Sequence, residues 1–230
     1  MNLKLSNSND LISLKNSKIP LSRKTAFGAG LFYILTFVSI PTLFLYSPIH
    51  NPDYLLSKAN NNNVVIGVIL ELTVALCGII SSIILHSVLK KQNQTLSIGL
   101  IASRIVEAGT IFVGVSFLLA AVSLHQNGAT TSYIPITKTL VILYDRIFSI
   151  GQGFMPAIND ILLGILLYKS RLVPRSLALI GIIGAFPLFL GFFAIIFGII
   201  ERTSPFAALS ALMVAVFEFS LGIYFLIKSI

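Results

Sequence analysis

Long apolar stretches alternate with short polar loops along this chain, and the polar segments are too short to fold alone. Six stretches contain the roughly 20 residues that a helix needs to cross a hydrocarbon core of about 30 Å. They do not alternate apolar with polar positions and they exceed the roughly 10 residues of a membrane strand, so helices are favoured over strands. The pattern therefore predicts an all-α polytopic membrane protein, a bundle of six transmembrane helices. The stretches cover approximately residues 27–47, 64–88, 97–124, 138–168, 177–199 and 206–228.

The positions of lysine and arginine predict how this bundle is oriented. Cytoplasmic loops of membrane proteins carry an excess of these residues. Eleven of them fall in the N-terminal tail, the second and fourth loops and the C-terminal end, against three in the opposite loops. We therefore expect a multi-pass protein of the cell membrane with both termini in the cytoplasm. Residues 1–25 are predicted to form a flexible basic cytosolic tail, and residues 26–230 a transmembrane domain.

The composition agrees with a membrane protein and argues against nucleic-acid binding. Of the 230 residues, 56% are hydrophobic and only 10% are charged, with a mean hydropathy of +0.93. The net charge of +8 is scattered over short loops and the tail, where membrane topology places cations. Cys77 is the sole cysteine, which excludes an internal disulfide and a CxxC pair. Membrane lipids are the partners that we expect, and the sequence does not predict an oligomeric state.

The fourth stretch is unusually long and is interrupted in the middle. Gly151, Gln152 and Gly153 are followed by Pro156. A tilted helix with a proline kink explains this pattern, since membrane helices tolerate such breaks. A helix whose opened backbone lines a binding site explains it too, as in many transporters. Both interpretations remain open at this point.

Ionisable residues inside the predicted spans are the strongest indication of function. A charge at the centre of a membrane helix costs about 2.5–3.5 kcal/mol, whereas each large aliphatic residue returns only about 0.3–0.6 kcal/mol. Such residues therefore need partners inside the bundle. Asp160 lies nearer the cytosolic end of its span and is less informative. The central ones are Glu71, Arg104, Glu107, Asp145, Arg146 and Glu218.

Three of these acids lie on helix faces that carry small residues. Ala75 follows Glu71 by four positions, Gly222 follows Glu218 by four, and Glu107 lies on a similar stripe. Small residues mark the faces on which membrane helices pack closely. We therefore expect the three glutamates to point into the bundle and to form a polar cluster that opens to the outside. The candidate binding residues are Glu71, Arg104, Glu107, Asp145, Asn159 and Glu218.

The chain lacks the common catalytic and nucleotide-binding motifs. HExxH, GxSxG, the P-loop and GxGxxG are all absent. His86 stands alone near the inner end of its span, whereas His50 and His125 fall in predicted outer loops. The sequence thus predicts no metal site and no cofactor, and it assigns no catalytic residue. The acids outnumber the arginines inside the spans, so either some of them are protonated or a cation joins them.

Several segments resemble one family of integral membrane proteins, which is mainly bacterial and is known as domain of unknown function 4386. The chain departs from the family pattern at residues 143–146, where the family often has His-Asp-Trp, and at Ser176, where it often has Trp. The resemblance implies a six-span α-helical membrane protein and brings no activity, substrate or cofactor. The segments that carry it are Tyr33 with Thr36 and Phe37, Asp53-Tyr54, Leu70-Glu71, residues 104–107, 151–153, Asn159, Leu163-Gly164, 167–175, Gly181 and 218–222.

These observations favour a carrier or binding protein for a small solute or a coupled ion, with the acids as proton or cation sites. The same carboxylates also fit an intramembrane enzyme that acts on a lipid-like substrate by acid–base chemistry. A non-catalytic accessory or assembly protein fits as well, because buried ion pairs often specify packing alone. The sequence does not separate the three hypotheses, and it does not decide whether the protein is an enzyme.

Overall fold

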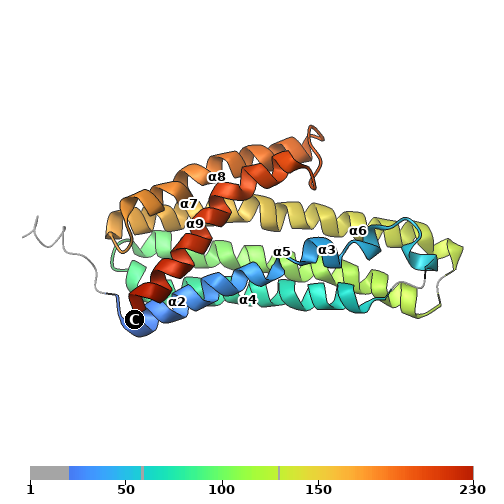
Figure 1. Cartoon of the computed structure of the whole chain (residues 1–230), viewed down its shortest axis with the longest axis horizontal. Helices are drawn as coiled ribbons and strands as arrows, with labels where there is room; N and C mark the ends of the chain where they lie inside the picture. Colours follow the sequence, from blue (N-terminus) through green and yellow to red (C-terminus); the bar gives the residue numbers. More distant parts are fainter. Residues whose placement is uncertain (1–20, 58–59, 129, 230) are drawn as a thin grey trace, which may run out of the picture.

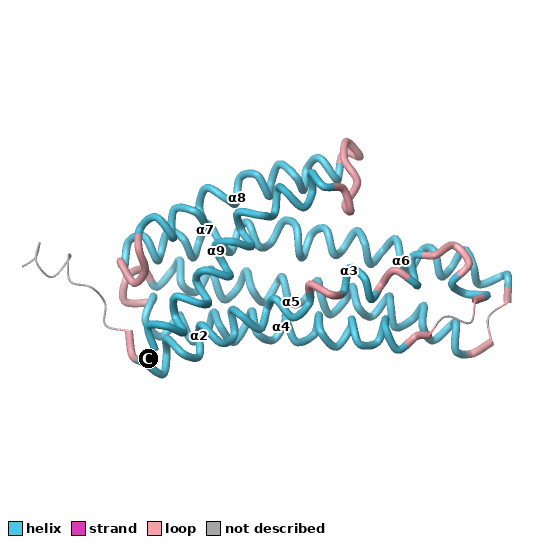
Figure 2. Tube along the Cα trace, viewed as in Figure 1, coloured by secondary structure: helices cyan, strands magenta, loops and turns pink. Residues whose placement is uncertain are grey.

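The computed structural model describes residues 21–57, 60–128 and 130–229, and this part of the chain is helical with no strand (Figure 2). Residues 1–20, which make up most of the predicted basic tail, lie outside the described residues. The elements are α2 (Arg23–Leu35), η1 (Thr36–Ser39), α3 (Thr42–Leu45), η2 (Pro48–His50), η3 (Tyr54–Leu56), α4 (Asn62–Leu89), α5 (Gln94–Gln126), η4 (Thr131–Tyr133), α6 (Ile134–Phe148), η5 (Ser149–Phe154), α7 (Met155–Ser170), α8 (Arg175–Ile196) and α9 (Pro205–Ser229).

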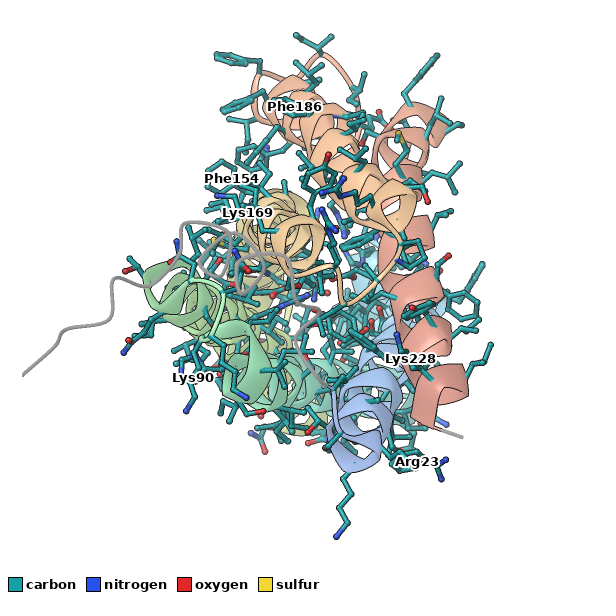
Figure 3. The ribbon with its side chains drawn as sticks, turned by 90° about the vertical axis from the view of Figure 1, so that its left-hand side faces the viewer. Arg23, Lys90, Phe154, Lys169, Phe186 and Lys228 are labelled. Carbon is teal, nitrogen blue, oxygen red and sulfur yellow. The ribbon has the colours of Figure 1, made fainter. Side chains whose placement is uncertain are left out.

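Within this part of the chain, six helical segments are long and apolar enough to cross a membrane, so the predicted all-α, six-span fold is confirmed. Figure 3 looks onto the end of the bundle where Arg23, Lys90, Lys169 and Lys228 gather. This common end is the one that the cation distribution assigns to the cytoplasm; the orientation itself stays a prediction. The six segments are Arg23–Leu45, Asn62–Leu89, Gln94–Gln126, Thr131–Ser170, Arg175–Ile196 and Pro205–Lys228.

Helix α4 shows how the sequence separates a lipid face from a packing face. Ile69, Leu76 and Ile83 recur every seven residues and are each more than half exposed, as expected for side chains that face lipid tails. Glu71 and Ser82 lie on other faces of the same helix and are 1% exposed. The face with small and polar residues therefore packs against the bundle, as the stripe pattern predicts.

The first span is not one regular helix. Helix α2 gives way to the 3-10 turn η1 and resumes as the short α3 after Pro41. Proline has no backbone N–H and cannot continue the hydrogen-bond ladder. The Thr36 hydroxyl also donates to the Tyr33 carbonyl at 2.6 Å. Thr36, Phe37 and Ser39 of η1 line a cavity of the bundle.

The fourth span stays helical from η4 to α7, so the interruption at its centre is a local change of winding. Residues 149–154 form the π-helical segment η5, a feature that often marks functional sites. A Cβ atom at Gly151 would collide with the Thr110 side chain of α5, so glycine is needed for this close approach. The segment places Gln152 against two internal cavities.

Figure 1 shows α4, α5 and α6 side by side along the long axis, with the α8–α9 hairpin diverging from them. The first half of α9 packs on α8 and its second half packs on α2. At the second contact, a Cβ atom on Gly30 would lie 2.8 Å from the Gly222 carbonyl oxygen, so the two backbones nearly touch. The first and last spans are thus direct neighbours.

Three apolar clusters are packed among the described residues, and a polar layer lies between the two larger ones. One of these two includes Leu100 of α5, and the other includes Ala108 and Ile111 of the same helix. Arg104 and Glu107 fall between these positions and are both buried. The layer between the two larger clusters is therefore the place to look for a site.

Candidate functional site

Arg104 holds the polar layer together from α5. Its Nη1 donates to Glu107 Oε2 at 2.9 Å, and its Nη2 donates to Glu218 Oε1 of α9 at 2.6 Å. The guanidinium also lies over the Tyr33 ring of α2, 5.8 Å from the ring centroid. Arg104 is only 4% exposed, so these are pairs removed from solvent and lipid. Such pairs need good geometry because burying each charge is costly.

Helix α7 adds an amide and a carboxyl group to the layer. The Asn159 side-chain N–H donates to Glu107 Oε2 at 2.8 Å. Asp160 is completely buried, and neither of its carboxyl oxygens has a hydrogen-bond partner among the described residues. The charged groups that interact electrostatically with Asp160 are Glu218, Arg104 and Glu107. The layer thus contains a second kind of acid, one that lacks a direct partner.

A cavity of about 180 Å³ lies against this layer. Arg104, Glu107 and Glu218 form its charged wall, and Thr36, Ser39 and Gln152 are among its polar lining residues, contributed by η1 and η5. Several buried polar atoms in the layer have no partner within the described residues. These atoms are Arg104 Nε, Ser103 Oγ and Asn159 Oδ1. Unsatisfied buried polar atoms are rare in native proteins and indicate bound water, ions or ligands.

The charges of the layer do not balance when every group is ionised. Glu107, Asp160 and Glu218 face the single guanidinium of Arg104. An isolated carboxylate in an apolar medium becomes neutral or attracts a counter-charge, because its Born energy is too large otherwise. The layer therefore has room for two more positive charges, supplied as protons or by a cationic solute.

Glu71 is buried but does not belong to this layer. It accepts a hydrogen bond from the Tyr144 hydroxyl of α6 at 2.6 Å. Gly78 is the α4 residue that faces Arg104, because a Cβ atom there would lie 3.6 Å from Arg104 Cδ. Glu71 precedes Gly78 by seven residues, or about 10 Å of helix at 1.5 Å per residue. The structure thus places Glu71 apart from the group around Arg104, as the helical rise between the two positions requires.

Asp145 is also separate from the layer, contrary to the single cluster that the sequence indicates. Its Oδ1 contacts His50 Nε2 at 3.1 Å and Arg202 Nη2 at 2.7 Å. Asp145 precedes Asn159 by 14 residues on one continuous helix, which corresponds to about 20 Å. Arg146 points elsewhere and is exposed. Asp145 is thus part of a second polar group at the opposite end of the bundle from Lys90 and Lys169.

The second group borders a larger cavity of about 600 Å³ between the α3–η2 turn, α6 and the α8–α9 loop. His50 and Arg202 line it. The Arg202 guanidinium also lies over the Phe148 ring at 5.0 Å. The hydrogen bond to Asp145 is the main cause that raises the pKa of His50, and the hydrogen bond to the Tyr46 carbonyl acts in the same direction.

A comparison with protein families shows to which family the chain belongs. A family model described as domain of unknown function, DUF4386, matches residues 28–229. The chain belongs to this family. No curated protein and no solved structure matches the chain.

Several of the segments that carry the DUF4386 resemblance meet at the smaller cavity. Residues 104–107, 151–153 and Glu218 come from three different spans and all contribute to its lining. Asn159 joins them through Glu107. Of the predicted site residues, the structure thus brings together Arg104, Glu107, Asn159 and Glu218. This convergence makes the DUF4386 cavity the candidate functional site.

Sequence reasoning missed three residues that the structure places at these sites. The depth of Asp160 in its span argues against it, although Gly164 follows it by four positions, the spacing that also separates Ala75 from Glu71 and Gly222 from Glu218. His50 and Arg202 lie in loops that carry no periodic signal. Among the described residues, no three His, Cys, Asp or Glu side chains are arranged to hold a metal ion.

Proposed function

We propose that this DUF4386 protein is a membrane carrier or solute-binding protein whose small polar solute occupies the 180 Å³ cavity together with protons. The observation that supports it most is Asp160, a fully buried carboxyl group without a partner, beside an arginine already shared by Glu107 and Glu218. A group of this kind is expected to exchange a proton or a cation. The site lies between the two larger apolar clusters, which suits a binding site near the middle of a bundle.

The pairing pattern favours binding over acid–base catalysis. A catalytic base needs a lone pair directed at its substrate, whereas Glu107 and Glu218 are both engaged by Arg104. Packing alone is also a weaker explanation, because in a purely structural polar layer every buried polar group is expected to have a hydrogen-bond partner. Here Arg104 Nε and Asp160 remain unsatisfied within the described residues, and Arg104 lines the cavity.

The cavity suits a solute that carries an amino group. Glu107 and Glu218 present carboxylates at its wall, and Thr36 and Gln152 offer further hydrogen-bond partners. Binding an ammonium group beside these acids adds one positive charge to the layer. Release of one proton from the acids of the layer compensates this charge, so solute binding and proton release are expected to be coupled.

The test uses the full-length protein in liposomes that contain a pH-sensitive dye. Small amines and amino acids are added one at a time outside the vesicles. We expect at least one of them to drive a change of internal pH that is lost in Asp160→Asn and Glu218→Gln. Glu201→Gln changes an exposed acid of the α8–α9 loop and is the matched control. The proposal is wrong if every solute gives the response of protein-free vesicles, or if the Asp160 and Glu201 variants behave alike.

A further inference from the structure

The larger cavity carries charge of the opposite sign to the candidate site. His50 of η2 and Arg202 of the α8–α9 loop are the charged residues that line it. Asp145 lies behind them and lines a neighbouring cavity of about 260 Å³, which also contacts Lys138. The 600 Å³ cavity therefore presents cations, and among its described lining residues there is no acid.

The hydrogen bonds of His50 determine its charge. Its Nδ1 lies 2.8 Å from the carbonyl oxygen of Tyr46, which can only accept a hydrogen bond. Its Nε2 lies 3.1 Å from Asp145 Oδ1, the oxygen that Arg202 also contacts and that accepts as well. Both ring nitrogens must then donate, which only the protonated imidazolium can do. His50 and Arg202 thus supply two positive charges against the single carboxylate of Asp145.

The cavity also contains donors without acceptors. Arg202 uses Nη2 for Asp145, and among the described residues its other N–H groups have no acceptor. Thr42 and Thr203 add hydroxyl groups to the wall. A planar guanidinium with free N–H groups is the preferred partner of carboxylates and phosphates.

We infer that this cavity is a second binding site, which takes a carboxylate or phosphate group attached to an apolar or aromatic body. The anionic group accepts from the free N–H groups of Arg202 and lies near the positive charge of His50, and the body lies against Leu43 and Phe148. A volume of about 600 Å³ is within the usual range for organic ligands and is too large for the anion alone. Leu43 lines the cavity and is 63% exposed, so the cavity is open at α3 and either a lipid or a dissolved anion has access. This inference does not depend on the proposed function, because it concerns other residues and a ligand of opposite charge.

The inference predicts a specific pH dependence of binding. His50 faces Asp145 on α6, Arg202 on the α8–α9 loop and the Tyr46 carbonyl, with Lys138 across the neighbouring cavity. Loss of its proton at high pH removes one of the two cations from the wall. Affinity for the anion is therefore expected to fall as the pH rises, and to become independent of pH in His50→Gln.

The experiment is calorimetric titration of the purified full-length protein in an uncharged detergent. The probes are short-chain phosphatidic acid, the corresponding uncharged diacylglycerol, benzoate and inorganic phosphate. We expect an anionic probe to bind about tenfold or more weakly to Arg202→Gln, because a charge-assisted hydrogen bond is lost. Binding to His50→Gln should also be weaker, because one positive charge of the wall is removed. Arg146→Gln removes an exposed arginine one residue from Asp145 and is the matched control, with unchanged affinity expected.

Two further comparisons keep the result decisive if the Arg202 variant folds poorly. Arg202→Lys keeps the positive charge and most of the side chain, so it is expected to fold and to bind the anionic probe more tightly than Arg202→Gln. Binding of phosphatidic acid alone assigns the site to a lipid, and binding of benzoate or phosphate alone assigns it to a solute. The inference is overturned if no anionic probe binds, if diacylglycerol binds as tightly as phosphatidic acid, or if Arg146→Gln weakens binding as much as Arg202→Gln.

Discussion

Arg104 is the residue on which the polar layer depends, because it is the common partner of two acids from different helices. Its spacing from Glu107 made that pair foreseeable from the sequence, since residues three apart are neighbours on a helix. The involvement of Glu218, which is 114 positions away, could be inferred only from its inward-facing stripe. A residue with this many buried contacts affects both stability and binding.

Replacing Arg104 with glutamine is expected to lower the free energy of unfolding by about 3–5 kcal/mol, because it leaves two carboxylates buried without a cation. The additional replacements Glu107→Gln and Glu218→Gln should restore part of this loss. Equilibrium unfolding in detergent measures both effects. A loss below about 1 kcal/mol is typical of exposed pairs and would show that water already screens the layer.

His50 makes a contribution to stability that depends on pH. Its pKa is raised in the folded protein, mainly by the hydrogen bond to Asp145. The stabilisation is therefore complete below the ordinary pKa of about 6.5 and is lost as the pH rises through the raised value. Thermal unfolding at a series of pH values should show this loss in the native chain and not in His50→Gln. Parallel pH profiles for the two proteins would contradict it.

At the scale of elements, the contact between α2 and α9 depends on the absence of side chains at one crossing. A Cβ atom on Gly30 would meet the Gly222 carbonyl oxygen, the Leu226 backbone nitrogen and the Leu226 side chain, each within 3 Å. Two of these three atoms belong to the backbone and cannot rotate away. The helices would have to separate, and α9 carries Glu218 into the polar layer.

Gly30→Ala is accordingly expected to destabilise the protein by about 1–3 kcal/mol, the usual effect of overpacking. Gly109→Ala is the matched control in α5, because a Cβ atom there meets nothing within 4 Å. That control should be neutral, or stabilising by up to about 1 kcal/mol through helix propensity. Unfolding midpoints of the two variants give the comparison, and equal midpoints would mean that α2 and α9 separate at little cost.

The elements also show which features a sequence can predict. The six spans follow from apolar length, and the break in the first span has a visible cause in Pro41. The π-helical winding of η5 cannot be predicted from the sequence, because a glycine pair and a proline are compatible with a kinked helix and with an opened helix equally well. The pairing of His50 with Asp145 depends on how distant elements pack, and no local pattern encodes that.

At the scale of the whole molecule, the distribution of cations predicts that Lys90 and Asn127 lie on opposite sides of the membrane. Lys90 is exposed in the α4–α5 loop, and Asn127 is exposed just beyond the other end of α5. Single cysteines at these positions, in a Cys77→Ala background, separate the two sides. A membrane-impermeant thiol reagent added to intact cells should label Asn127→Cys and spare Lys90→Cys. The reverse labelling would invert the predicted topology.

The neighbouring positions of α2 and α9 have a consequence for biogenesis. A ribosome delivers α2 to the membrane first and α9 last, yet each supplies part of the other's packing surface. Until α9 is synthesised, α2 lacks this surface and Arg104 lacks Glu218. The polar layer is therefore completed only after translation of the last span. A chain truncated before α9 would retain five spans but would leave Arg104 without one of its two carboxylate partners.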